Sequence, residues 1–247
     1  LNDEFQHVHK YNPIEHIKTR IKTPESIVKK LRRYGYEISI ENMVKYINDI
    51  AGVRLICSFT SDIYRLAEMI EYDPLTDVHS LVYFHNELDR LDMQPDKVVS
   101  IISCDVNGLK LINDYLGHDT GNSMLQTAAR LLRSSLRSTD CVARLGGDEF
   151  AVLLPQCNLR DAARVLEKIR AVFRHYNEHS GNVPVIMSFG LSGAEEAPSL
   201  REALALADRR MLHEKHGSRL VSGHAIKAWI EKRKDCVVSL EESRYDG

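Results

Sequence analysis

The stretch that decides the fold reads Arg144-Leu145-Gly146-Gly147-Asp148-Glu149-Phe150 and lies between the apolar segments 141–143 and 151–154. Apolar runs on both sides of a Gly-Gly pair predict two strands joined by a tight turn. Glycines permit positive φ and let a ligand approach the backbone, while two acidic residues supply oxygens of the kind that bind Mg²⁺. The stretch predicts a hairpin with a nucleotide and metal site at its tip. An ordinary acidic turn is the alternative.

A second carboxylate follows an apolar segment upstream. Residues 98–104 form a nearly continuous apolar run typical of a buried strand, and Asp105 comes directly after it. A carboxylate at a strand end and another on a hairpin tip can share one or two divalent ions, with substrate phosphates completing the coordination. We therefore expect Asp105 and Asp148 to meet around metal.

Several motifs in this region resemble those of the GGDEF family of diguanylate cyclases, over about residues 73–219. In family order and at compatible spacing, they are Asp105-x-Asn107-x-x-Lys110, Asn113-Asp114, Gly117-His118, Gly146-Gly147-Asp148-Glu149-Phe150 and Lys215-x-x-x-Arg219. The resemblance implies an enzyme that condenses two GTP into cyclic di-GMP and two pyrophosphates. It also implies Mg²⁺ (or Mn²⁺) as cofactor, a homodimer as the working form, and cyclic di-GMP as an inhibitor.

The resemblance assigns a role to each site residue. It implies metal binding by Asp105, Asp148 and the Val106 carbonyl, and catalytic roles for Asp148, Glu149 and Lys110. The implied substrate-binding residues surround the phosphates or the guanine: Gly108, Leu109, Asn113, Asn122, Gly146, Gly147, Lys215 and Arg219. Taken singly, each lysine or arginine is more often a solvated surface residue.

Two departures from the family pattern bear on activity. Asn122 stands where the family usually has aspartate, and one amide carbonyl can satisfy only part of the guanine edge. A guanine donor left without a partner costs binding free energy. We therefore expect GTP to bind more weakly, or purine selectivity to be lower, by roughly tenfold or more. The family's Thr-Gly-Leu-x-Asn-Arg opening is replaced by residues 76–81, which lack that glycine and arginine. These changes favour the alternative of a weak or inactive domain that senses cyclic di-GMP or GTP.

A possible second ligand site precedes the hairpin. Arg137 and Asp140 stand at the spacing of the family's inhibitory product site, and Lys168 and Arg170 fall near its further contacts. An arginine can pair with a phosphate or stack on guanine. The resemblance predicts product binding here, with a salt-bridged loop as the alternative.

Residues 1–72 are expected to form a separate, mainly helical segment. Thr23 and Pro24 predict a helix start and Gly35 its end, followed by helices over 41–50 and 62–70 and a strand over 53–59. Residues 18–22 and 49–54 resemble the start of the RelA/SpoT alarmone synthetase domain. This implies phosphate contacts at Arg20 and Lys22 and a metal ligand at Asp49.

The later RelA/SpoT elements have no counterpart before residue 73, so residues 1–72 are predicted to be a truncated segment. Alarmone synthesis by this segment remains a second alternative. A solvated basic helix face explains the same cations.

The remaining pattern predicts an α/β (α+β) fold: a cyclase-like central mixed sheet flanked by helices, with an exposed hairpin. Helices are predicted over 80–91, 120–136, 159–176 and 199–216, and a strand over 183–191. The predicted domains are 1–72, 73–222 and a 223–247 extension, with a short strand and a terminal helix within 220–247.

Composition restricts the partners. The 247 residues carry 33 basic and 35 acidic side chains, a net charge of −2, so no general nucleic-acid footprint is expected. The five cysteines include no C-x-x-C pair, and no apolar run is long enough to span a membrane. These features predict a cytoplasmic protein with no membrane segment within this chain.

Overall fold

The computed structural model describes residues 14–21, 23–33, 35, 37–38, 51–57 and 70–245. The chain divides into two compact units, 1–67 and 68–247. In the first, β1 (Ile14–Ile21) pairs antiparallel with β2 (Ala51–Cys57). The predicted first helix is confirmed as α2 (Pro24–Arg33), and Gly35 follows with φ of 76°.

One prediction for the first unit needs correction. The basic stretch from residue 16 to residue 21 lies in strand β1, so the explanation as a solvated helix face is wrong. Pairing with β2 satisfies its backbone, which a short basic run alone does not reveal. The predicted helix over 41–50, nearly all of that over 62–70, and the proposed ligands Lys22 and Asp49 lie outside the described residues.

The second unit is built on a four-stranded sheet in the order β4-β5-β3-β6. Its strands are β3 (Val99–Val106), β4 (Cys141–Gly146), β5 (Glu149–Pro155) and β6 (Met187–Gly193). The α/β class is therefore confirmed, while every ladder of this sheet is antiparallel rather than mixed. Parallel pairing in the described residues is limited to the isolated bridge between His79 and Ala143.

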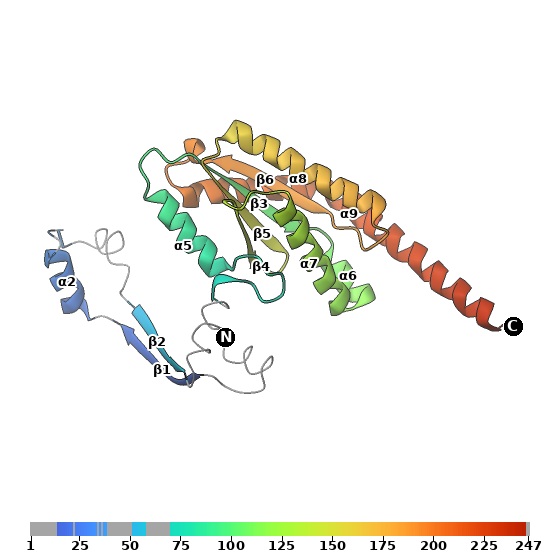
Figure 1. Cartoon of the computed structure of the whole chain (residues 1–247), viewed down its shortest axis with the longest axis horizontal. Helices are drawn as coiled ribbons and strands as arrows, with labels where there is room; N and C mark the ends of the chain where they lie inside the picture. Colours follow the sequence, from blue (N-terminus) through green and yellow to red (C-terminus); the bar gives the residue numbers. More distant parts are fainter. Residues whose placement is uncertain are drawn as a thin grey trace. The chain divides into compact units, whose positions relative to one another are not determined.

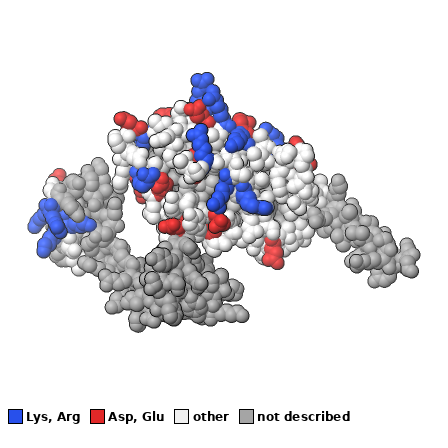
Figure 2. All heavy atoms as spheres, in the orientation of Figure 1, with Lys and Arg blue, Asp and Glu red and all other residues white. Residues whose placement is uncertain are grey.

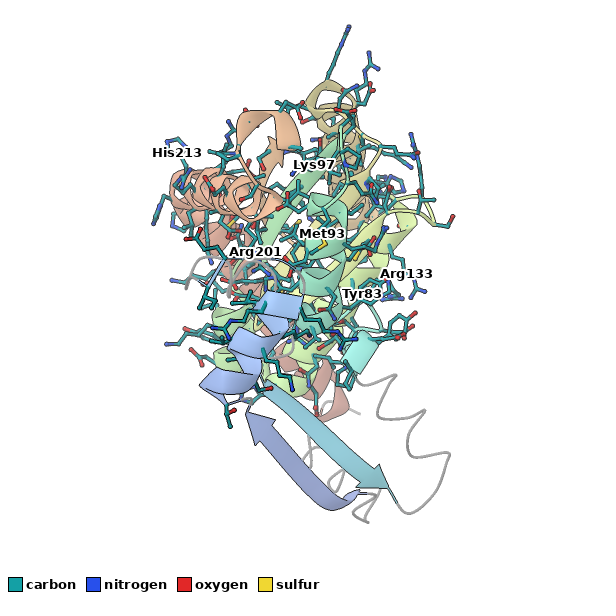
Figure 3. The ribbon with its side chains drawn as sticks, turned by 90° about the vertical axis from the view of Figure 1, so that its left-hand side faces the viewer. Tyr83, Met93, Lys97, Arg133, Arg201 and His213 are labelled. Atoms are coloured by element: carbon teal, nitrogen blue, oxygen red, sulfur yellow. The ribbon has the colours of Figure 1, made fainter. Side chains whose placement is uncertain are left out.

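Helices cover both faces of this sheet (Figure 1). α5 (Leu81–Asp92) and the first turns of α9 (Leu200–Tyr245) pack on one face. Arg201 of α9, labelled in Figure 3, pairs with Asp89 of α5 at 2.7 Å. α6 (Leu109–Leu116), α7 (His118–Ser134) and α8 (Leu159–His179) cover the other. Strand alternation divides the core, since Ile101 joins the α5 and α9 cluster and Ile102 the opposite one.

The strand predicted over 183–191 begins later, at Met187. Asn177 of α8 explains the delay, because its side chain accepts from Val185 N at 2.8 Å and donates to Val185 O at 2.9 Å. These bonds satisfy a backbone that would otherwise seek a ladder partner.

The C-terminal prediction of a short strand is wrong, because α9 continues as one helix to Tyr245 and crosses the predicted boundary after residue 222. Buried residues recur at helical spacing along it: Ala203, Ala207, Met211, Ser222, Ile226 and Ile230. The later members of this stripe pack on the sheet unit and favour continuation of the helix. Gly190 permits the close approach of α9, since a Cβ there would lie 2.0 Å from the Ala207 carbonyl oxygen.

Charges of both signs are interspersed over the face shown in Figure 2. None of the helices in the described part of the chain combines the length and apolarity needed to cross a membrane.

Candidate active site

The β4–β5 hairpin presents its glycines to open space. Neither Gly146 nor Gly147 has an atom within 4 Å of where a Cβ would stand, and Gly147 adopts a φ of 37°. The Arg144 guanidinium donates to the Gly147 carbonyl at 2.8 Å and to the Asp73 carboxylate at 3.2 Å, and so links the hairpin tip to the start of the unit. The turn is thus open to a ligand while its base is tied to the start of the unit.

The two predicted aspartates lie at the same end of the sheet. In the β3–β5 ladder Asp105 is paired with Glu149, and the next amide, Val106 N, donates to the Asp148 carbonyl at 2.9 Å. These contacts place three carboxylates at one junction. Backbone pairing therefore joins residues about forty positions apart.

Asp105 is buried, with 2% of its surface exposed. Its Oδ2 accepts from Lys215 Nζ at 2.6 Å, whereas its buried Oδ1 has no hydrogen-bond partner. Burial raises the pKa of Asp105, Lys215 opposes this shift, and the nearby Asp148 charge adds to it. Burial also raises the pKa of Glu149, with further contributions from Asp148 and Asp105. The junction holds more negative charge than its own cation neutralises.

The segment after Asp105 forms a backbone donor site. Gly108, with φ of 78°, is the N-cap of α6, and Leu109 and Lys110 start that helix. First-turn amides have no intrahelical partner and attract anions. Ile226 of α9 packs against Gly108, and its Cδ1 lies 2.3 Å from the position of a Cβ there. A larger residue would have to displace this side chain and adopt a positive φ, so glycine is favoured.

The two predicted base-binding residues flank the α6–α7 junction. The Asn113 Oδ1 is buried and has no hydrogen-bond partner, and a Cβ on Gly121 would lie 1.9 Å from it. The neighbouring Asn122 is exposed. Glycine at position 121 therefore makes room for an amide whose acceptor remains free for a ligand.

The predicted product-site residues are only partly brought together. Arg137 and Asp140 form one turn, in which Arg137 N donates to Asp140 Oδ2 at 2.9 Å. Lys168 reaches the adjoining end of α7 and donates to the Ser135 carbonyl at 2.9 Å. Arg170 instead contacts residues of α9 and β6.

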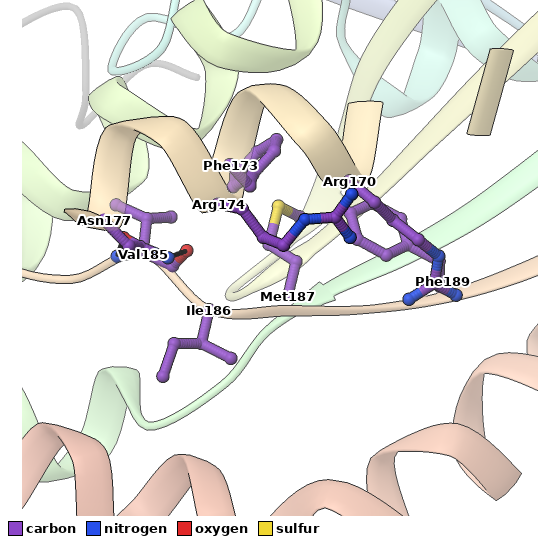
Figure 4. Close-up of a pocket in the computed structure, with 8 residues that line it drawn as sticks. All are labelled: Arg170, Phe173, Arg174, Asn177, Val185, Ile186, Met187 and Phe189. Atoms are coloured by element: carbon purple, nitrogen blue, oxygen red, sulfur yellow. Dashed lines mark hydrogen bonds between the residues drawn. The ribbon is translucent and has the colours of Figure 1, made fainter. Parts of the chain in front are cut away.

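Arg170 pairs with Glu214 of α9 at 2.5 Å and stacks over the Phe189 ring at 5.2 Å. It lines a pocket of about 150 Å³ between α8 and the start of β6 (Figure 4). These contacts do not join Arg170 to the turn of Arg137 and Asp140. The reason is that side chains two positions apart on a helix, such as Lys168 and Arg170, point in different directions.

Lys215 and Arg219 both belong to α9, but the Arg219 side chain lies outside the described part. Sequence reasoning missed two supporting residues. Arg144 supports the hairpin, and Ser188 accepts from the Asn107 side chain at 2.9 Å and fixes the loop after Asp105. Arg144 stands two residues before the Gly-Gly pair, which is a usable signal, whereas the sequence around Ser188 offers none.

The junction carries the oxygen atoms that a divalent ion would need as ligands. Within the described residues, no group of three or more His, Cys, Asp or Glu side chains has the arrangement of a complete metal site. Two carboxylates and a backbone carbonyl nevertheless fit a cation such as Mg²⁺, which usually retains water and phosphate ligands. The unpartnered buried Asp105 Oδ1 is the strongest support, because a buried anionic oxygen normally has a partner.

Replacing the buried carboxylate tests this electrostatic description. The folded-state pKa of Asp105 is raised, so its ionisation opposes folding above the ordinary aspartate pKa of about 4. We predict that Asp105→Asn increases the free energy of unfolding at pH 7 by about 0.5–2 kcal/mol, and that this gain shrinks as the pH falls through the raised folded-state pKa and is lost below about 4. Urea unfolding at several pH values, without divalent ions, measures it. Asp114→Asn, at an exposed position of α6, is the control; a wild type more stable than Asp105→Asn at pH 7 contradicts the description.

Comparison with known proteins agrees with this geometry. Residues 70–220 match the family model "Diguanylate cyclase, GGDEF domain", and residues 19–89 match the region found in RelA/SpoT proteins. GTP pyrophosphokinase YwaC of Bacillus subtilis is 51% identical over 71 residues, covering 29% of this chain and 34% of that protein. The chain spans about a third or less of the first curated relatives.

Solved structures give the same result for the second unit. The GGDEF domain of TpbB (YfiN) from Pseudomonas aeruginosa is 33% identical with a TM-score of 0.54, covering 60% of this chain and 90% of that one. Diguanylate cyclase SiaD from the same organism, solved with its activator SiaC, is 27% identical with a TM-score of 0.56, covering 79% and 73%. With more than half of its length matched to the family model, the chain belongs to the GGDEF family of diguanylate cyclase domains.

Proposed function

We propose that this chain binds GTP with Mg²⁺ (or Mn²⁺) and condenses two GTP molecules into cyclic di-GMP. The observation that carries the proposal is the buried, unpartnered Asp105 Oδ1 beside the Asp148 hairpin tip. Asp105, Asp148 and the Val106 carbonyl hold the ion. When bound, it neutralises phosphate charge and polarises the reacting phosphate.

The protein's own groups align the reactants. The 3′-hydroxyl oxygen of one GTP forms a bond to the α-phosphorus of the other, and the bond from that phosphorus to the bridging oxygen breaks as pyrophosphate leaves. In this proposal Glu149, whose pKa is raised by burial, accepts the hydroxyl proton. The amides of Leu109 and Lys110, with the Lys110 side chain, position the phosphates.

Lys215 has two partners in this proposal. It neutralises Asp105 in the structure through the 2.6 Å ion pair. With its side chain 36% exposed, it can turn to a bound triphosphate, joined there by Arg219. Each protomer holds one GTP, so the chemistry requires a homodimer that brings two sites face to face. A cytoplasmic supply of GTP fits this reaction.

Product formation tests the proposal. Incubation with GTP and Mg²⁺ is expected to yield cyclic di-GMP by mass spectrometry, and Asp148→Asn to lower the rate by at least about 10²–10³-fold through lost electrostatic stabilisation. Glu178→Gln, at an exposed position of α8, should leave the rate unchanged. Absence of cyclic di-GMP at every protein concentration up to that of a stable dimer refutes the enzyme. Adding ATP tests the second alternative, pyrophosphate transfer by the RelA/SpoT-like region.

The base site predicts a gain from one substitution. Asn122→Asp supplies a second acceptor to the guanine edge and should tighten GTP binding by about tenfold. Calorimetry with a non-reacting GTP analogue measures the Kd. Asn86→Asp on the exposed side of α5 controls for added negative charge. Equal or weaker binding by Asn122→Asp shows that this residue does not contact guanine.

The alternative function is a sensor that binds cyclic di-GMP without making it. Asn122 favours this alternative, because a weaker contact to guanine lowers turnover. Arg137→Ala should weaken cyclic di-GMP binding by at least about tenfold, the loss expected for a charge-assisted hydrogen bond. Arg164→Ala, an exposed change on α8, is the control. Binding that depends on Arg137 without synthesis identifies a sensor, while binding with synthesis identifies product feedback. Unchanged binding in Arg137→Ala removes the product site.

A further inference from the structure

A cavity of about 540 Å³ lies between α7, the end of α8 and the extended part of α9. Its volume falls within the range of about 300–1,000 Å³ typical of small-molecule sites. Its lining includes none of the residues assigned above to metal, GTP or cyclic di-GMP. The cavity therefore requires an explanation separate from the nucleotide site.

One wall comes from the part of α9 beyond the matched GGDEF region, which ends at residue 220. Ile226 and Ile230 are 0% and 3% exposed and belong to the core, and Trp229 packs against the same cluster. These two neighbours fix the helix turn that carries Trp229. The indole therefore belongs to the cavity wall, because the helix turn that carries it is anchored in the core.

The rest of the apolar lining suits a flat ring. Leu116 and Met124 line the cavity together with Tyr176 of α8. Aromatic and thioether side chains bind ring faces and edges favourably. Together with Trp229 they can enclose one or two fused rings.

The polar lining selects for negative charge. Among the lining residues there is one cation, Arg130, and no carboxylate. Arg130 Nη2 donates to Thr127 Oγ1 at 3.0 Å, and no acidic side chain of the described residues forms an ion pair with it. The Thr127 hydroxyl in turn donates to the Ser123 carbonyl, so the guanidinium is held at the cavity with its charge unpaired.

We propose that this cavity binds a planar aromatic anion of one or two fused rings, with the ring against Trp229 and the anionic group on Arg130. The chemistry is common to aromatic carboxylates and to nucleoside monophosphates. Because Ile226, one helix turn from Trp229, packs on Gly108, the occupant also holds the helix segment that covers the loop after Asp105.

The single tryptophan provides a specific reporter. In a ¹H–¹⁵N spectrum of the full chain its indole gives one resonance, which 2-naphthoate is expected to shift at one-to-one stoichiometry with a Kd of about 1 mM, as expected for a ligand of this size. The uncharged 2-naphthamide should bind about tenfold more weakly, because it loses the charge-assisted hydrogen bond. A parallel titration with AMP distinguishes a nucleotide from a carboxylate as the preferred source.

Variants locate the binding. Arg130→Gln should weaken 2-naphthoate binding by about tenfold, and Ser123→Phe, which fills the cavity from an exposed position, should abolish it. Arg133→Gln, on the same helix and paired with Asp77 outside the cavity, should bind as the wild type does. Binding unaffected by Ser123→Phe in a folded variant, or no indole shift with either ligand at 10 mM (about ten times the expected Kd), overturns the proposal.

Discussion

The antiparallel pairing of β3 with β5 is the constraint on which the candidate active site depends. It places Asp105 opposite Glu149 and joins Val106 to the Asp148 carbonyl, so acidic residues distant in sequence meet at one sheet end. A buried carboxylate is costly unless it is neutralised. Lys215 donates to one oxygen of Asp105, and the other oxygen has no partner. This is the arrangement expected of a carboxylate that can bind a cation.

The sequence was sufficient to predict the elements that carry this junction. A hairpin at Gly146 and Gly147 and a buried strand ending at Asp105 follow from local turn chemistry and apolar runs, and both are found. Their pairing could be predicted only through family resemblance, because strand order depends on non-local contacts. The free Asn113 Oδ1 and the need for Gly121 beside it likewise appear only when α6 and α7 pack.

The C-terminal region marks the limit of local patterns. The short run around Val237 is typical of a strand, yet the backbone there is helical because α9 continues along a buried stripe through Ile226 and Ile230. Arg170 is a second example: its place in the sequence suggested the product site, whereas its guanidinium pairs with Glu214 and lies over the Phe189 ring. In both cases the tertiary partners of the segment could not be predicted from local patterns.

The most direct test of the account is whether Asp105 and Asp148 share a divalent ion. Electron paramagnetic resonance can count Mn²⁺ bound by the wild type in the presence of a non-reacting GTP analogue, and by the two single variants Asp105→Asn and Asp148→Asn. The account predicts nucleotide-dependent Mn²⁺ binding in the wild type and at least about tenfold weaker binding in each variant, since each loses a carboxylate ligand. Equal Mn²⁺ binding by all three proteins would contradict it.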